Sequence, residues 1–197
     1  TFSAFPATGN DITAAFAPNN DDGYTSQLAL GFSFNYYCTT YTSVAVCSNG
    51  YLVFGTIPTI NGANPTQTIP DPATPNGMVA LNMNDFDPSF GGTVTFTTIG
   101  TSPNQMFIAT YSNVPIWYNS ATNTPSVPVY NTGQIVLYET SNDIEIHSGT
   151  IGQSPYNMTQ GIENQTGTLG MAAPGRNNSL WTTTNTAYRW SKTLIGA

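Results

Sequence analysis

Residues 27–55 read QLALGFSFNYYCTTYTSVAVCSNGYLVFG, and this stretch decides the fold class. An apolar residue stands at every second position of its first part: Leu28, Leu30, Phe32, Phe34 and Tyr36. A period of two places these side chains on one face of a β-strand. Residues 43–55 are rich in β-branched and aromatic residues as well, so the stretch predicts two antiparallel strands joined in a hairpin.

The only two cysteines of the chain, Cys38 and Cys47, lie in this hairpin. If the hairpin is centred between Tyr41 and Ser43, they face each other, and opposed Cβ atoms lie about 4.5 to 5.5 Å apart. A disulfide needs about 3.5 to 4.5 Å, so we expect a disulfide-stapled hairpin in an oxidising compartment. Two buried free thiols are the alternative. A metal site is disfavoured because the single histidine, His147, is far along the chain.

The rest of the chain shows short strand-like runs separated by turn residues and no helical periodicity. This pattern predicts an all-β fold, an antiparallel β-sandwich of jelly-roll-like type, in one domain over residues 1–197. Residues 1–25 are weakly patterned and are expected to be an N-terminal arm or an edge strand. The expected strands after the hairpin are 77–83, 92–100, 105–117, 133–139, 143–151, 158–167 and 186–195.

The charge balance excludes several classes of partner. The 197 residues include ten acids and only three cations, Arg176, Arg189 and Lys192, for a net charge of −7. Nucleic acid and anionic membrane surfaces both require clustered cations, and no apolar run reaches the ~20 residues of a spanning helix. Charged residues make up 7% of the chain, against about 25% in typical domains. We therefore expect an extracellular or cell-surface protein whose first residues follow a removed signal peptide.

Four segments resemble nidogen-like extracellular β domains of bacterial surface and secreted proteins, and they follow the order of that family. They are GFSFNYYCTTYTSVAVCSNGYLVFG (31–55), LNMNDFDPSFGGTVTF (81–96), GQIVLYETSNDIEIHSGTI (133–151) and TQGIENQTGTLG (159–170). The resemblance implies a β-sandwich displayed outside the cell, as in adhesins, and it implies no particular ligand. The chain departs from the family pattern at Met83, Asn84, Cys38 and Cys47, where Trp, Asp, Gly and a small residue are usual.

Oxygen ligands recur at alternate positions in NMNDFDPS, residues 82–89. Asn84, Asp85 and Asp87 are therefore candidate ligands for calcium, which prefers six to eight oxygens. Two carboxylates give a weak site unless Asp71 or backbone carbonyls join them. The alternative is that these side chains only cap nearby backbone N–H groups. The acids of PNNDDG (18–23) are a second candidate, for which a solvated turn is the better interpretation.

Titratable residues are densest at Glu139, Asp143, Glu145 and His147. On a strand, Glu145 and His147 share a face, and paired carboxylates can hydrolyse glycosides if they flank one cleft. A hairpin with exposed acids is the preferred interpretation, so we expect no catalytic residues and no enzyme.

The candidate ligand-binding residues lie in the loop 118–133 or directly before it, and they are Trp117, Tyr118, Asn119, Asn123 and Tyr130. Aromatic rings beside amides suit sugars, whereas ordinary packing of the rings is the alternative. The expected function is a non-catalytic binding module, an adhesin-type domain that contacts a glycan or a protein on a surface. The alternative is a subunit of a filament or surface layer that binds other copies of itself by strand donation, and the third is a glycan hydrolase.

Overall fold

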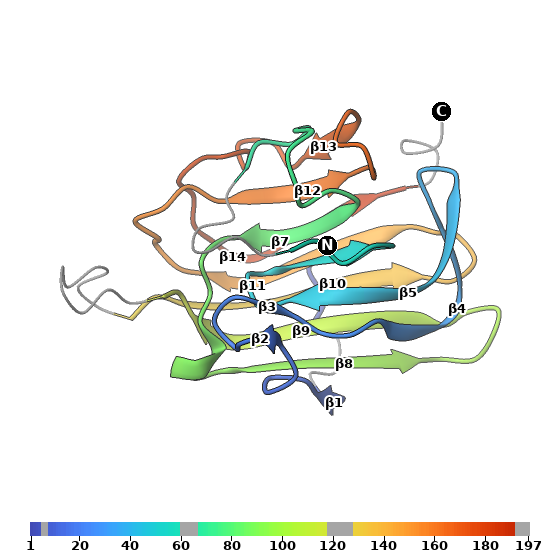
Figure 1. Cartoon of the computed structure of the whole chain (residues 1–197), viewed down its shortest axis with the longest axis horizontal. Helices are drawn as coiled ribbons and strands as arrows, with labels where there is room; N and C mark the ends of the chain where they lie inside the picture. Colours follow the sequence, from blue (N-terminus) through green and yellow to red (C-terminus); the bar gives the residue numbers. More distant parts are fainter. Residues whose placement is uncertain (5–7, 60–66, 118–127, 192–197) are drawn as a thin grey trace.

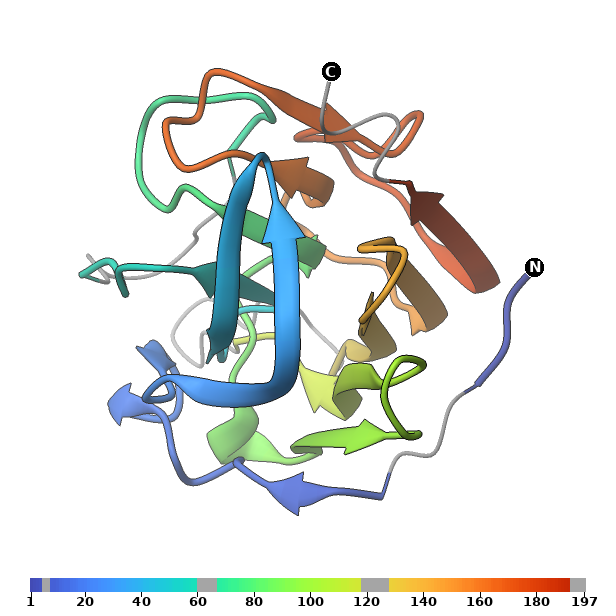
Figure 2. The same cartoon turned by 90° about the vertical axis from the view of Figure 1, so that its right-hand side faces the viewer.

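A computed structural model describes residues 1–4, 8–59, 67–117 and 128–191. Two antiparallel β-sheets lie face to face, as Figures 1 and 2 show together, so the expected all-β sandwich is confirmed. Its one described helix is the 3₁₀ turn η1 (Pro88–Phe90). Within the described ranges, no helix is long and apolar enough to cross a membrane.

The two sheets differ in size, and their strand orders mix segments that are distant in sequence. Sheet A has the order β1-β8-β9-β10-β11-β14, and sheet B has the order β13-β12-β7-β6-β5-β3-β2, with β4 paired to β5. The strands of sheet A are β1 (Asn10–Asp11), β8 (Thr93–Ile99), β9 (Met106–Pro115), β10 (Tyr130–Tyr138), β11 (Ile144–Ile151) and β14 (Thr183–Trp190). The strands of sheet B are β2 (Ala17–Pro18), β3 (Gly23–Tyr24), β4 (Leu28–Tyr36), β5 (Thr39–Cys47), β6 (Tyr51–Phe54), β7 (Met78–Met83), β12 (Thr159–Glu163) and β13 (Gly170–Ala172).

The alternating residues of β4 point into the core, as their period predicted. Leu30, Phe34 and Tyr36 are completely buried, and the residues between them are more exposed. They pack between the sheets against side chains such as Val94 and Ile135 of sheet A. Burial of each large side chain stabilises the fold by roughly 1.5 to 3 kcal/mol, so this alternation is what holds the two layers together.

The outer face of sheet B is also covered. Met78, Ala80 and Met83 of β7 are completely buried in a second cluster, which includes Ile69 from the segment 67–77. The segment 67–77 is therefore partly a structural cover for this face, and Ile69 is not available for contact with a partner. This explains why β7 is apolar on both faces, a pattern typical of strands that are buried on two sides.

The expected disulfide is wrong. The β4–β5 turn consists of Tyr37 and Cys38, which adopt left-handed φ values of 44° and 65°, and Tyr36 pairs with Thr39. Two such residues form the tight turn that matches the twist of a hairpin. Cys38 is exposed at the tip, whereas Cys47 is buried at the far end of β5, and both are free thiols. Along a strand, nine residues span roughly 30 Å, so no disulfide can join them.

We therefore expect one thiol of the native protein to react with an aromatic disulfide reagent. Burial raises the pKa of the Cys47 thiol to about 12, so its thiolate is scarce as well as shielded. Cys38→Ser should abolish the native reaction, and unfolding should reveal the second thiol. Reductant should leave the melting temperature unchanged. A reductant-dependent melting temperature in dilute monomeric protein would contradict the free thiols.

The N-terminal residues lie against sheet A of the same chain. Strand β1 pairs with the edge strand β8. Before it, the backbone N–H of Ser3 donates to Nδ1 of His147 at 3.2 Å, and the ring of Phe2 contacts the same imidazole. Residues 1–4 at the N-terminus thus lie on the outer face of sheet A beside β11, as Figure 2 shows.

Candidate functional site at one end of the sandwich

Several connections meet at the end of the sandwich where β5 and β7 finish, on the left of Figure 1. The side chain of Asn49 joins two of them, because its Nδ2 donates to Asp22 Oδ1 at 3.0 Å and its Oδ1 accepts from the N–H of Phe86 at 2.8 Å. The N–H of Trp117 donates to the carbonyl of Asp85 at 2.7 Å. These bonds fix the loops 19–22, 48–50 and 84–92 relative to the end of β9.

Three carboxylates gather at this end. One oxygen from each of Asp21, Asp22 and Asp85 lies within 4.8 Å of the others. Asp85 is buried, and the other two are half-buried. Like charges this close repel each other strongly away from bulk water, and the described residues place no Lys or Arg at the cluster. Carboxylates with nearby carbonyls form the ligand set that a hard cation such as calcium takes.

The electrostatic cost of the cluster falls mainly on Asp21. Burial, together with the charges of Asp87, Asp22 and Asp85, raises the pKa of its carboxyl group to about 7. Its Oδ1 is enclosed and has no hydrogen-bond partner among the described residues. A bound cation would reverse this effect, because it stabilises the charged form of a carboxylate.

The structure separates the three residues that the sequence nominated as metal ligands. Only Asp85 has an oxygen within 4.8 Å of oxygens of both Asp21 and Asp22, although Asp87 lies near enough for its charge to raise the pKa of Asp21. Asn84 bonds Ser154 through Nδ2 at 2.9 Å and accepts the N–H of Asp85, whereas Asp87 accepts from the N–H of Ser89 at 2.9 Å and caps η1. Asp71 bonds the N–H of Ala73 at 2.9 Å. The capping alternative therefore describes Asn84 and Asp87.

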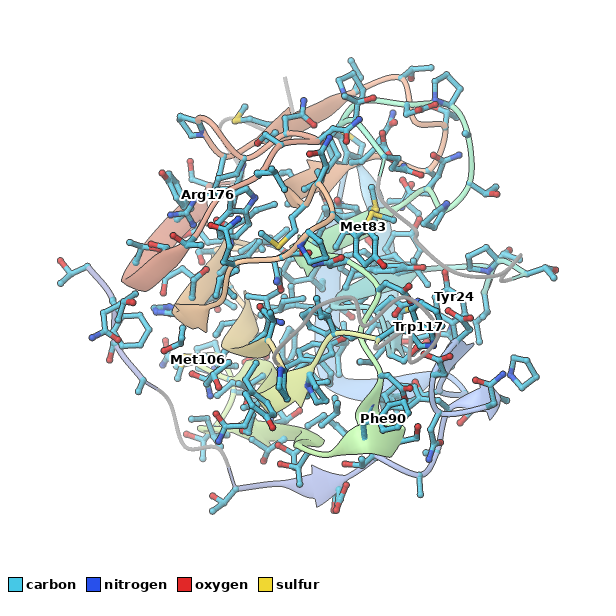
Figure 3. The ribbon with its side chains drawn as sticks, turned by 90° about the vertical axis from the view of Figure 1, so that its left-hand side faces the viewer. Tyr24, Met83, Phe90, Met106, Trp117 and Arg176 are labelled. Carbon is cyan, nitrogen blue, oxygen red and sulfur yellow. The ribbon has the colours of Figure 1, made fainter. Side chains whose placement is uncertain are left out.

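The same end presents aromatic side chains. Phe90 is 64% exposed and Tyr130 is 50% exposed, and Trp117 is partly exposed. Tyr130 pairs with Pro115, whose carbonyl accepts the N–H of Asp87, so these rings belong to the connections that carry the carboxylates. Figure 3 shows Trp117 and Phe90 on this face. The other nominated residues, Tyr118, Asn119 and Asn123, lie outside the described residues.

The titratable side chains at the β10–β11 hairpin are held by hydrogen bonds and ion pairs to other residues of the chain. Glu145 accepts from the Tyr138 hydroxyl and from His147 Nε2, each at 2.8 Å, and from Arg189 at 3.0 Å. Although burial opposes it, these partners hold the pKa of Glu145 below its usual value. Arg189 also pairs with Asp143. These acids are therefore less exposed than expected, because Asp143 is buried and Glu145 is half-buried, and the absence of catalysis stays a prediction.

A second acid with a raised pKa lies under the segment 67–77, and the sequence analysis missed it. Glu163 is fully buried at the end of β12. It accepts from the N–H of Asp71 at 2.5 Å and from Gln67 Nε2 at 3.2 Å. Burial raises its pKa to about 7, although the bond from Asp71 opposes the shift. Glu163 therefore anchors the cover segment and does not face an open site.

Comparison with known proteins agrees with this architecture. A family model described as NIDO related matches residues 1–194, which is nearly the whole chain. The resemblance of the four segments to nidogen-like domains is thereby supported at the level of the family. No curated protein and no solved structure matches the chain.

Proposed function

Since the chain belongs to the NIDO-related family, we propose that it is a secreted or cell-surface binding module without catalytic activity, of the adhesin type. Members of a nidogen-related family are typically extracellular, and the scarcity of charged residues fits such an environment. The partner is a glycan or a protein on another surface. The sandwich supplies a rigid scaffold, and the loops at one end supply the contacts.

One observation carries this proposal: exposed aromatic rings and a carboxylate cluster lie at the same end of the sandwich. Phe90 and Tyr130 expose large apolar surfaces there, and isolated rings of this kind anchor interfaces. Asp85, behind them, is tied to Trp117 through its carbonyl. A calcium ion on the carboxylates would hold the loops 19–22 and 84–92 together and so preorganise the contact surface.

The test is binding of the fluorescently labelled protein to a glycan array and to cultured cells in calcium buffer. Phe90→Ala and Tyr130→Ala should each weaken binding by about tenfold, which corresponds to roughly 1.4 kcal/mol. Leu169→Ala is the matched control, because Leu169 is similarly exposed, at 57%, beside β13. Equal losses in all three variants would contradict a contact surface at this end.

The size distribution of the purified protein separates this proposal from its structural rival. A binding module should remain monomeric with and without calcium. Filaments or ladders would instead make the chain a structural subunit, and they would require residues 1–4 to leave their own sheet A, where Ser3 bonds His147. Large ordered species would therefore overturn the binding-module proposal.

A further inference from the structure

Residues 1–4, the N-terminal segment, lie on the outer face of sheet A and are held there mainly through one histidine (Figure 2). They form no strand. Within the described part of the chain they have one hydrogen bond to the sheet, from the N–H of Ser3 to Nδ1 of His147 at 3.2 Å. The ring of Phe2 adds a contact, because its centroid lies 5.9 Å from that of the imidazole. The state of this imidazole therefore decides how firmly the segment is bound.

The N-terminal segment packs loosely on the sheet. A hollow of about 100 Å³ remains between them, lined from both sides by Phe2, Ala4, Thr110, Gln134 and His147. Atoms beside an empty space lack dispersion partners on that side. Little packing energy therefore opposes the release of the segment once its hydrogen bond is lost.

The two ring nitrogens of His147 have different roles. The backbone N–H of Ser3 can only donate, so Nδ1 must be the acceptor and carries no proton. The proton of the neutral ring is therefore on Nε2, which lies 2.8 Å from Oε2 of Glu145 and donates to it. The bond to Ser3 thus requires the neutral imidazole in this tautomer.

The charged groups around His147 come from its own strand and from the strands on either side. Glu145 faces the imidazole from β11, Tyr138 of β10 donates to Glu145, and Arg189 of β14 bonds Glu145 and Asp143. Neither the N-terminal segment nor β9, on the far side of β10, has a charged side chain. Although burial opposes it, the bonds from His147 and Tyr138 hold the pKa of Glu145 below its usual value. The imidazole therefore faces a carboxylate, which favours its protonated form.

A second proton on the imidazole has two opposite consequences. It must go to Nδ1, where it points at the N–H of Ser3, so two donors face each other and their hydrogen bond is lost. It also turns the contact with Glu145 into an ion pair. We propose that protonation of His147 releases the N-terminal segment from sheet A and uncovers the outer face of the sheet beneath it.

This switch lies away from the loop end, so it holds whether or not Phe90 and Tyr130 contact a partner. Histidine is the side chain that ordinarily changes its charge between pH 5 and pH 8, and His147 is the only one in the chain. The lost bond to Ser3 and the new ion pair offset each other in the free energy of unfolding. Acidification should therefore move the segment and leave the sandwich folded.

The experiment is an NMR titration of the ¹⁵N-labelled full chain from pH 8 to pH 5. The imidazole nitrogens report protonation, whereas the amide signal of Ser3 and the NOE between the rings of Phe2 and His147 report docking. Both sets of signals should change with one midpoint. The ratio of docked to released segment should fall by about tenfold, the effect of one lost hydrogen bond.

Two variants distinguish the switch from a contact that is only structural. His147→Asn can offer its carboxamide oxygen to Ser3 in place of Nδ1, so the segment should stay docked throughout the titration. Glu145→Gln keeps an acceptor for Nε2 but removes the charge that favours the imidazolium, so the midpoint should move to lower pH. Glu139→Gln is the matched control, since Glu139 bonds Ser102, and it should leave the midpoint unchanged.

Two results would overturn the switch. One is an N-terminal segment that stays docked on sheet A down to pH 5 in the unsubstituted protein. The other is release of the segment from His147→Asn at the same pH as from the unsubstituted protein. Melting temperatures show whether each variant is folded. Should His147→Asn fail to fold, Glu145→Gln decides the question, and an unchanged midpoint in that variant rejects the proposal.

Discussion

Calcium should raise the melting temperature of this protein by about 5 to 10 °C when its concentration is about a hundredfold above the dissociation constant. Saturation of that degree stabilises the folded state by about 2.7 kcal/mol, and 1 kcal/mol moves the melting temperature of a chain of this size by about 2 to 4 °C. The effect arises because Asp21, Asp22 and Asp85 present oxygens within 4.8 Å of one another. Differential scanning calorimetry with calcium and with a chelator measures it directly.

Substitution of Asp21 should change the stability of the calcium-free protein and of the calcium-bound protein in opposite directions. In chelator, Asp21→Asn should stabilise the protein, because it removes a carboxylate whose pKa burial raises to about 7. In calcium, the same variant should lose most of the stabilisation, because it removes a ligand oxygen charge. Asp11→Asn is the control, since Asp11 is exposed on β1 and bonds Thr13. Loss of stability in Asp21→Asn without calcium would contradict the repulsive cluster.

The calcium response should weaken as the pH falls below 7. Protonated Asp21 cannot serve as a charged ligand, and its carboxyl group takes up a proton near that pH. Binding of the ion and of the proton are therefore linked, and each lowers the affinity for the other. Isothermal titration at pH 6 and pH 8 should show tighter calcium binding at the higher pH.

The fold class follows from the sequence because a period of two is a direct consequence of strand geometry. The pairing within the hairpin does not follow, and the reason lies in its turn. Tyr37 and Cys38 adopt left-handed φ values without the Asn or Gly that usually identifies such a turn, whereas the run of Thr and Ser after them resembles a turn. Moving the centre by about five residues leaves the strands in place but puts Cys38 in the turn before β5 and Cys47 at its far end.

The sequence indicated the members of the carboxylate cluster separately, but it did not indicate that they lie together. Asp85 and the acids at 21 and 22 each stand out as candidate ligands, but more than sixty positions separate them. They meet because β3 pairs with β5, and β5 is followed through β6 to β7. A single sequence does not specify that order of strands. Asn49, which links Asp22 to the backbone of Phe86, gave no signal beyond the Asn-Gly turn in which it stands.

The calcium-free protein should be more stable at pH 5.5 than at pH 8, because the buried carboxyl group of Glu163 ionises between these values. Burial raises the pKa of this carboxyl group from its ordinary 4.5 to about 7 in the folded state. Between these two values the folded chain binds the proton more readily than the unfolded chain does. The free energy of unfolding therefore falls as the pH rises through this window, and the loss is complete above about pH 7.

The size of the effect follows from the width of that window. A shift from 4.5 to about 7 corresponds to at most about 3 kcal/mol. We expect roughly 1 to 2 kcal/mol, because relaxation of the surrounding residues and entry of water reduce the cost of a buried charge. Urea unfolding in chelator at half-unit steps from pH 5 to pH 8.5 measures the profile, and the slope change should centre between the two pKa values.

Glu163→Gln should flatten this profile and stabilise the protein at pH 8, because the glutamine is neutral throughout. Its new amide group needs an acceptor, and Gln67 can offer its carboxamide oxygen only by giving up its bond to the Pro75 carbonyl, which offsets part of the gain. Glu139→Gln removes the same charge beside Ser102, outside the cover segment, and should leave the slope in place. The Asp21 carboxyl group accounts for the remaining dependence of stability on pH. The variant that combines Asp21→Asn with Glu163→Gln should therefore have a stability nearly independent of pH over this range. If Glu163→Gln destabilises the protein equally at pH 5 and pH 8, the carboxylate holds the segment 67–77 as a charged anchor and the expected cost of its ionisation is absent.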